Sequence, residues 1–113
     1  MKKKEIRVRC WVDIDGQKFF GPGRATLLEL IEETGSIAKA CKAMGMSYKK
    51  GFDMVTELNE LGRKPYVMSH KGGAKGGGAE ITETGKKVID AYKRLTKKFA
   101  AIVAKDDELI KLV

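Results

Sequence analysis

The residues best suited to chemistry lie in the segment SIAKACKAMGMSYKKGFDMVTEL, residues 36–58. Its pattern places Lys49 and Lys50 in the first turn of a helix, although that end of a helix carries partial positive charge and favours acidic side chains. Glu57 and Glu60 follow farther along, where basic side chains are favoured. Local rules are often broken at functional sites. Because lysine donates to guanine O6 and N7 or gives a point charge to phosphate, we expect a nucleic acid as ligand.

The sequence lacks the residues that a zinc site, a phosphate-binding loop or an enzyme active site would need. The chain has one histidine, His70, and two cysteines, Cys10 and Cys41, without a CxxC pair. These counts argue against a zinc site. The glycines at 72–77 have the spacing of a phosphate-binding loop, but Gly78 stands where lysine is required. No nucleophile or paired-carboxylate signature accompanies the histidine, so we expect no metal, no cofactor and no enzyme activity.

Composition favours one basic domain. The chain has 113 residues and a formal net charge of +8, from 23 Lys+Arg against 15 Asp+Glu. Such an excess suggests nucleic acid or an anionic membrane surface as partner, although an inert basic surface would look the same. No apolar run approaches the roughly 18 residues of a membrane span, and no signal peptide is recognisable, so no membrane partner is expected. Two free thiols in apolar patterns fit the cytoplasm.

The first elements are predicted to be strands. Apolar residues alternate strictly from Ile6 to Ile14, which predicts a half-buried strand. The dipeptide Asp15-Gly16 favours a tight turn, and residues 17–20 return as a second strand.

Helical spacing then runs from Arg24 to Leu61 in three pieces. Ser36 and Ser47 can cap the second and third helices, and Gly45 breaks the chain between them, which is the helix-turn-helix layout. An ordinary helical hairpin in a core is the alternative. The residues expected to face inward from these two helices are Ile37, Ala40, Cys41, Met44, Phe52, Val55 and Leu58.

Residues 66–69 and 79–82 are short strand-like pieces around a loop with five glycines, Lys71 and Lys75. Two strands around a basic tip, directly after a helix-turn-helix, predict a wing.

A last helix, capped by Thr82, is predicted for residues 83–113, with apolar residues at alternating intervals of four and three. A second copy of the chain is the natural cover for this seam. The alternative is a helix broken at residues 105–108 and folded back on its own domain. The predicted dimer interface is Val88, Tyr92, Leu95, Phe99, Ile102 and Leu109.

Two stretches resemble the N-terminal DNA-binding domain of the ModE family, molybdate-responsive transcriptional regulators with a LysR-like winged helix. They are GPGRATLLELIEETGSIAKACKAMGMSYKKGFDMVTELN and GGAKGGGAEITETGKKVIDAY. The resemblance implies DNA binding and dimerisation. ModE-type proteins also carry molybdate-binding domains, which we expect this short form to lack, so that any sensor would be a separate protein. Cys41 and Gly51 stand where the family usually has alanine, and both are small enough for the same packing.

We therefore expect a mainly α protein with small β elements (α+β), a winged helix-turn-helix at 23–82 between an N-terminal hairpin at 1–22 and a dimerisation helix at 83–113. A dimer would read duplex DNA as a transcriptional regulator, with a recognition helix at 47–61 and a wing at 70–79. A nucleoid-type architectural protein and a winged-helix module that binds an acidic protein are the alternatives. The predicted DNA-binding residues are Ser36, Ser47, Tyr48, Lys49, Lys50, Asp53, Arg63, Lys64, Lys71 and Lys75.

Overall fold

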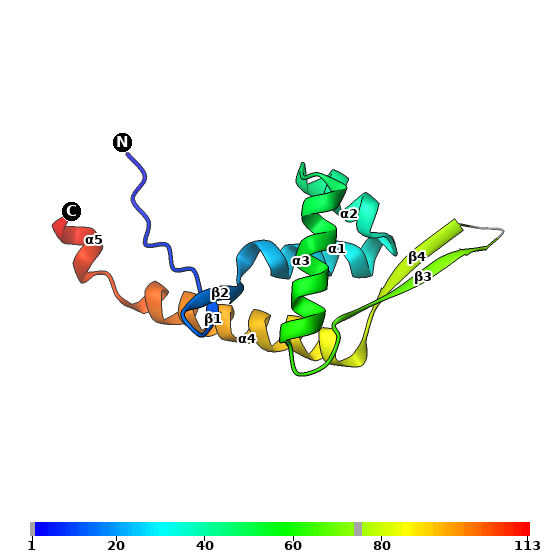
Figure 1. Cartoon of the computed structure of the whole chain (residues 1–113). Helices are drawn as coiled ribbons and strands as arrows, with labels where there is room; N and C mark the ends of the chain where they lie inside the picture. The colour runs from blue at the N-terminus through cyan, green and yellow to red at the C-terminus, as the bar shows by residue number, and fades with distance from the viewer. Residues whose placement is uncertain (1, 74–75) are drawn as a thin grey trace.

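The computed structural model describes the backbone of residues 2–73 and 76–113, and the side chains of residues 2–70 and 78–113. Two small antiparallel sheets and five helices make a mixed α+β winged-helix fold, as predicted (Figure 1). In chain order the elements are β1 (Val12–Ile14), β2 (Gln17–Phe20), α1 (Pro22–Thr34), α2 (Ile37–Met44), α3 (Tyr48–Leu61), β3 (Val67–Gly73), β4 (Gly76–Ile81), α4 (Glu83–Lys105) and α5 (Glu108–Leu112).

The predicted starts of α2 and α3 are confirmed, whereas α1 begins at Pro22 rather than Arg24. The hydroxyl of Ser36 accepts a hydrogen bond from the backbone N–H of Lys39, and that of Ser47 accepts from the N–H of Lys50. Both side chains satisfy backbone donors that the first turn of a helix leaves free. Gly45 ends α2 at φ 69°, a left-handed conformation that glycine adopts without strain. The turn between α2 and α3 is therefore fixed by its own local sequence.

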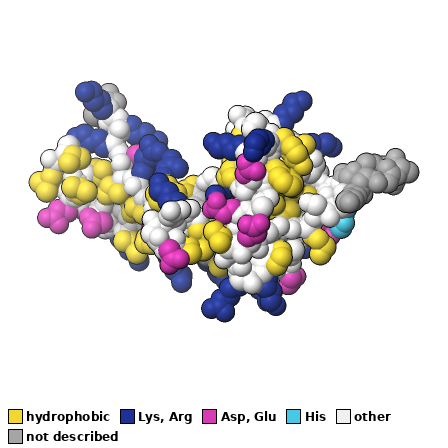
Figure 2. All heavy atoms as spheres, in the orientation of Figure 1, with side chains coloured by type: hydrophobic (Ala, Val, Ile, Leu, Met, Phe, Trp, Pro, Cys, Tyr) yellow, Lys and Arg dark blue, Asp and Glu magenta, His cyan; other side chains and the backbone are white. Residues whose placement is uncertain are grey.

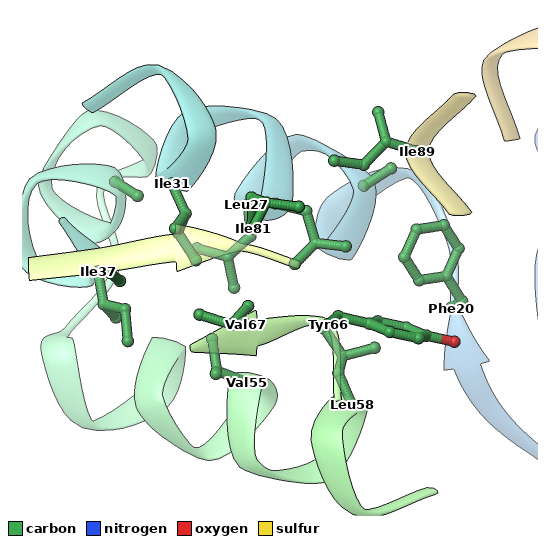
Figure 3. Close-up of a cluster of buried hydrophobic side chains, with 14 of the residues drawn as sticks. Phe20, Leu27, Ile31, Ile37, Val55, Leu58, Tyr66, Val67, Ile81 and Ile89 are labelled. Atoms are coloured by element: carbon green, nitrogen blue, oxygen red, sulfur yellow. The ribbon is translucent and has the colours of Figure 1, made fainter. Parts of the chain in front are cut away.

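The core joins the helix-turn-helix to the wing. Leu27, Leu28 and Ile31 of α1 are fully buried at its centre. Val67 of β3 and Ile81 of β4 pack into the same cluster, between α1 and α3 (Figure 3). Because the base of the wing lies inside the core, the direction of the wing is tied to the position of α3.

Gly51 allows α2 and α3 to pack closely. It is buried, and a Cβ at this position would overlap the Sγ of Cys41 on α2. Glycine inside a helix costs about 1 kcal/mol relative to alanine. The close packing of the two helices is the physical reason for this glycine.

Three local predictions are wrong. Strand β1 begins at Val12 rather than Ile6, because β2 has only four residues and leaves the earlier segment no partner. The ring of Phe52 is 45% exposed rather than inward and lies against Tyr48, with ring centroids 5.8 Å apart. The strands of the wing are longer than expected, since β3 extends to Gly73.

The continuous helix over residues 83–113 is also wrong. Helix α4 ends at Lys105, Asp106 takes an extended conformation at φ −104° and ψ 106°, and the short helix α5 follows. The break falls in the Lys105–Glu108 segment that the sequence offered as the alternative.

Candidate nucleic-acid interface

The first turn of α3 is presented to solvent. Ser47, Tyr48, Lys49 and Lys50 are all exposed, while Gly51 beneath them is buried. The side chain of Lys49 is 85% exposed, and space-filling atoms show Lys and Arg side chains gathered around this end of the helix-turn-helix (Figure 2). The cationic groups predicted from the sequence are therefore accessible to a ligand.

One flank of α3 faces α1 across an open hollow of about 340 Å³. Arg24 of α1 donates to Glu57 Oε1 at 2.8 Å and to the carbonyl oxygen of Phe19 at 2.7 Å. Glu57 thus has a structural partner, which explains one of the two acids that seemed misplaced in α3. The hollow is lined by Arg24, Ser47, Lys49, Lys50, Asp53, Met54 and Glu57.

The other flank of α3 meets the wing. The backbone N–H of Ala79 in β4 donates to the carbonyl oxygen of Gly35 at 2.9 Å, which ties the wing to the start of α2. A second hollow, of about 290 Å³, lies between these elements, and Ser36, Tyr48 and His70 are among its lining residues. Helix N-termini bind anions through their free N–H groups, so this hollow places one such terminus beside the wing.

Asn59 holds the end of α3 to the start of the wing, a role that sequence reasoning missed. Its Oδ1 accepts from the N–H groups of Tyr66 and Val67 at 2.8 and 3.0 Å, and its Nδ2 donates to the carbonyl oxygen of Val67 at 3.0 Å. The amide therefore satisfies three backbone groups at the start of β3. Nothing in the local sequence separates Asn59 from an ordinary polar residue.

The structure does not bring every predicted DNA-binding residue together. Arg63 and Lys64 are exposed but follow the opposite end of α3 from Lys49 and Lys50. A helix of this length separates its ends by roughly 20 Å at 1.5 Å per residue. The side chains of Lys71 and Lys75 lie outside the described residues. His70, beside them, has its Nε2 3.3 Å from Glu80 Oε2.

The residues predicted for a dimer interface differ in their burial. Val88 and Tyr92 pack against the chain's own core, and the Tyr92 ring meets Phe20 edge-on at a centroid distance of 5.1 Å. Phe99 is half-buried. The other three, farther along α4 and in α5, are exposed: Leu95 by 41%, Ile102 by 64% and Leu109 by 56%.

Burial sets the chemistry of the ionisable groups in the core. It raises the pKa of the Cys41 thiol and of the Tyr66 and Tyr92 hydroxyls. The thiol of Cys41 is therefore a neutral packing group rather than a nucleophile. Among the described residues no three His, Cys, Asp or Glu side chains cluster as metal ligands would. Within the same residues, no helix combines the length and apolar character that crossing a membrane requires.

Comparison with known proteins agrees with this geometry. The chain is 34% identical over 95 residues to the molybdenum transport protein ModE of Azotobacter vinelandii, which covers 84% of the chain and 35% of that protein. It is 37% identical over 97 residues to the DNA-binding transcriptional dual regulator ModE of Escherichia coli, covering 82% and 37%. The chain is a relative of the ModE regulators. No protein-family model matches it.

The matches cover most of this chain but less than half of each ModE relative. The transcriptional regulator ModE of Haemophilus influenzae is 29% identical over 111 residues, which covers 96% of the chain and 43% of that regulator. The chain spans about a third of the length of the curated relatives, from 27% to 43% in the proteins compared. This coverage is consistent with the DNA-binding domain of ModE alone, so the family resemblance inferred from the sequence is confirmed for that part.

Proposed function

We propose that this ModE relative is a DNA-binding transcriptional regulator that inserts the leading end of α3 into the major groove. The observation that carries the proposal is the exposed first turn of α3, with Ser47 as cap and Lys49 and Lys50 outward, between a hollow facing α1 and a hollow facing the wing. In helix-turn-helix proteins the N-terminal residues of the second helix contact base edges. The opposition of these lysines to the helix dipole then has a cause, because DNA phosphates and base edges supply the negative potential.

The neighbouring elements are assigned to the backbone of the same duplex. Ser36 and the free N–H groups of α2 would hold one phosphate, and Tyr48 would reach another phosphate or a thymine methyl group from the same hollow. The wing would follow the backbone or the minor groove. A homodimer would double the bases read, and its half-sites would lie about 34–36 Å apart or a multiple of that.

The names of the relatives suggest where to look for targets. One is a molybdenum transport protein and another a DNA-binding transcriptional dual regulator. We propose genes of molybdenum transport as the first candidates, and the cytoplasm as the place of action. Selecting bound fragments from the source genome would provide the operator and would test the gene assignment directly.

The recognition helix is tested with Lys49→Ala and Lys50→Ala on a selected fragment, by fluorescence anisotropy at fixed salt. A lysine that contacts a base should cost about 1–3 kcal/mol and relax the sequence preference at one position, whereas a lysine on phosphate should weaken all sequences alike. Lys86→Ala is the matched control, an exposed lysine on α4. Full affinity in both α3 variants, with circular dichroism unchanged, would discard the assignment.

An architectural role with little sequence choice is the second candidate, and the charge distribution favours it. Residues 22–82, which hold the helix-turn-helix and the wing, contain nine Lys+Arg and seven Asp+Glu, so six of the eight excess positive charges lie elsewhere. The two functions differ in the ratio of affinities for a selected and a random duplex at one salt concentration. A specific regulator should give a ratio of roughly 10³ or more, and an architectural protein a ratio near one.

A further inference from the structure

We propose that the basic arm, residues 2–11, is a second DNA-binding element that contacts the phosphate backbone of the duplex read by α3. This inference rests on the proposed function and adds a contact surface to it. Its starting point is the charge excess outside the helix-turn-helix and the wing, since the remaining 52 residues hold 14 Lys+Arg and eight Asp+Glu. Binding that depends on phosphates requires cations at the surface.

The arm presents its cations outward. Lys2, Lys3, Lys4, Arg7 and Arg9 are all exposed, with Glu5 as the single acid among them.

The opposite side of the arm is turned to the body. Ile6 and Cys10 are half-buried and line a hollow of about 550 Å³ together with Tyr92, Thr96 and other residues of α4. Arg7, Val8 and Arg9 line the same hollow but are exposed, so the arm packs on α4 through Ile6 and Cys10 while its cations stay accessible to solvent. The extended segment has no strand partner among the described residues.

Two contacts fix where the arm leaves the body. The Tyr92 hydroxyl donates to the carbonyl oxygen of Cys10 at 2.7 Å. The Trp11 ring covers Gly21, where a Cβ would overlap it, and the Nζ of Lys18 lies 4.7 Å from the ring centroid. An anchored arm loses less conformational entropy on binding than a free one, so its contacts with DNA are opposed by a smaller free-energy penalty.

The direction of the arm suits a shared duplex. In Figure 1 the arm and the leading end of α3 both rise from the same side of α4. At about 3.3 Å per extended residue the cations of residues 2–9 spread over roughly 23 Å, about two-thirds of a helical turn of DNA. The arm would therefore add contacts beside those of α3 and read no bases.

An acidic segment of a second copy is the competing occupant. Asp106, Asp107 and Glu108 are exposed, but Asp107 is already paired with Lys111 at 2.9 Å. The Nζ of Lys4 donates to the backbone oxygen of Val113 in the same chain. Two unpaired acids cannot match the other four cations of the arm, whereas duplex DNA offers one charge per roughly 1.7 Å of its axis. The charge balance thus favours DNA.

The test compares the triple variant Lys2→Gln, Lys3→Gln, Lys4→Gln with a charge-conserving control that carries arginine at the same positions. Affinity is measured from 50 to 200 mM salt on a fragment selected by the wild type and on a scrambled duplex of the same length and composition. The glutamine variant should lower the slope of log affinity against log salt by about 0.9 per lost phosphate contact, up to about 2.7. It should weaken both duplexes by the same factor, and the arginine control should match the wild type.

The outcomes separate the two proposals. Equal slopes for the glutamine variant and the wild type would overturn the arm contact and leave the role of α3 intact. If those slopes agree while sedimentation shows weaker self-association, the arm meets an acidic segment of a second copy instead. A wild type that binds neither duplex at 50 mM salt would overturn the proposed function together with the arm contact.

Discussion

The Nζ of Lys49 lies 3.0 Å from a carboxylate oxygen of Asp53, one turn farther along α3. Both side chains are mostly exposed, by 85% and 61%. An exposed pair of this spacing contributes only about 0.3–0.5 kcal/mol to stability. Because the pair lies on the proposed recognition face, we propose a second effect: the carboxylate would hold the ammonium group in one direction and would repel phosphates that approach off register.

Replacing Asp53 with Asn should therefore raise affinity for random DNA and lower the preference for a selected site. The amide keeps the size of the side chain but removes the repulsion and releases Lys49. A duplex that places a phosphate against the Asp53 carboxylate binds more weakly because of like-charge repulsion, so the carboxylate disfavours wrong partners. Competition titrations with selected and scrambled duplexes measure the ratio, and a ratio at or above that of the wild type would contradict this role. Glu60→Gln, at an exposed position near the far end of α3, is the matched control.

The wing should contribute through charge alone. Lys71→Gln together with Lys75→Gln removes both lysines of the glycine-rich tip. If each contacts one phosphate, the salt slope should fall by about 0.9 per contact, while the sequence preference remains. Salt titrations by anisotropy measure the slope. An unchanged slope in the double variant would mean that the tip does not contact DNA.

Close packing between α2 and α3 predicts a specific double-mutant result. Gly51→Ala alone should destabilise the fold by about 1–3 kcal/mol, because the new methyl group overlaps the buried Sγ of Cys41. Adding Cys41→Ala removes the overlapping Sγ, so that the alanine at position 51 can contribute its advantage of about 1 kcal/mol in helix propensity over glycine. The double variant should thus be more stable than Gly51→Ala in urea denaturation. Simple additivity of the two single changes would contradict the contact.

What the sequence predicted correctly was set by short-range rules. The caps at Ser36 and Ser47 and the helix break at Gly45 each depend on a few adjacent residues. The wing followed from two strand-like pieces around a glycine-rich loop, placed directly after the helix-turn-helix. The fold and the position of α3 could be derived from the sequence for this reason.

What the sequence missed depends on distant partners. Arg24 pairs with Glu57, 33 positions away, and no local pattern links them. The strand predicted from Ile6 has the right alternation, but pairing needs a neighbour that the short β2 does not supply. Phe52 was expected inward because it is apolar. Its place on the helix, at the edge of the face formed by Gly51, Val55 and Leu58, leaves it in solvent.

The last prediction concerns dimerisation through the apolar residues of α4 that are exposed in the single chain. Leu95 and Ile102 are seven positions apart, lie on one helical face and are exposed by 41% and 64%. Changing both to Asp should cost a monomer little stability but would place two uncompensated charges per chain in a dimer interface. Lys97→Asp, on the opposite face of α4, is the control for introduced negative charge.

Sedimentation equilibrium at micromolar concentration should give a dimer for the wild type and the control, and a folded monomer for the double variant. Loss of the dimer should also weaken binding to a two-half-site operator far more than binding to a single half-site, because the second site is then no longer held at high effective concentration. A wild type that sediments as a monomer and still binds its operator fully would refute the dimer. The exposed residues of α4 would then need another cover.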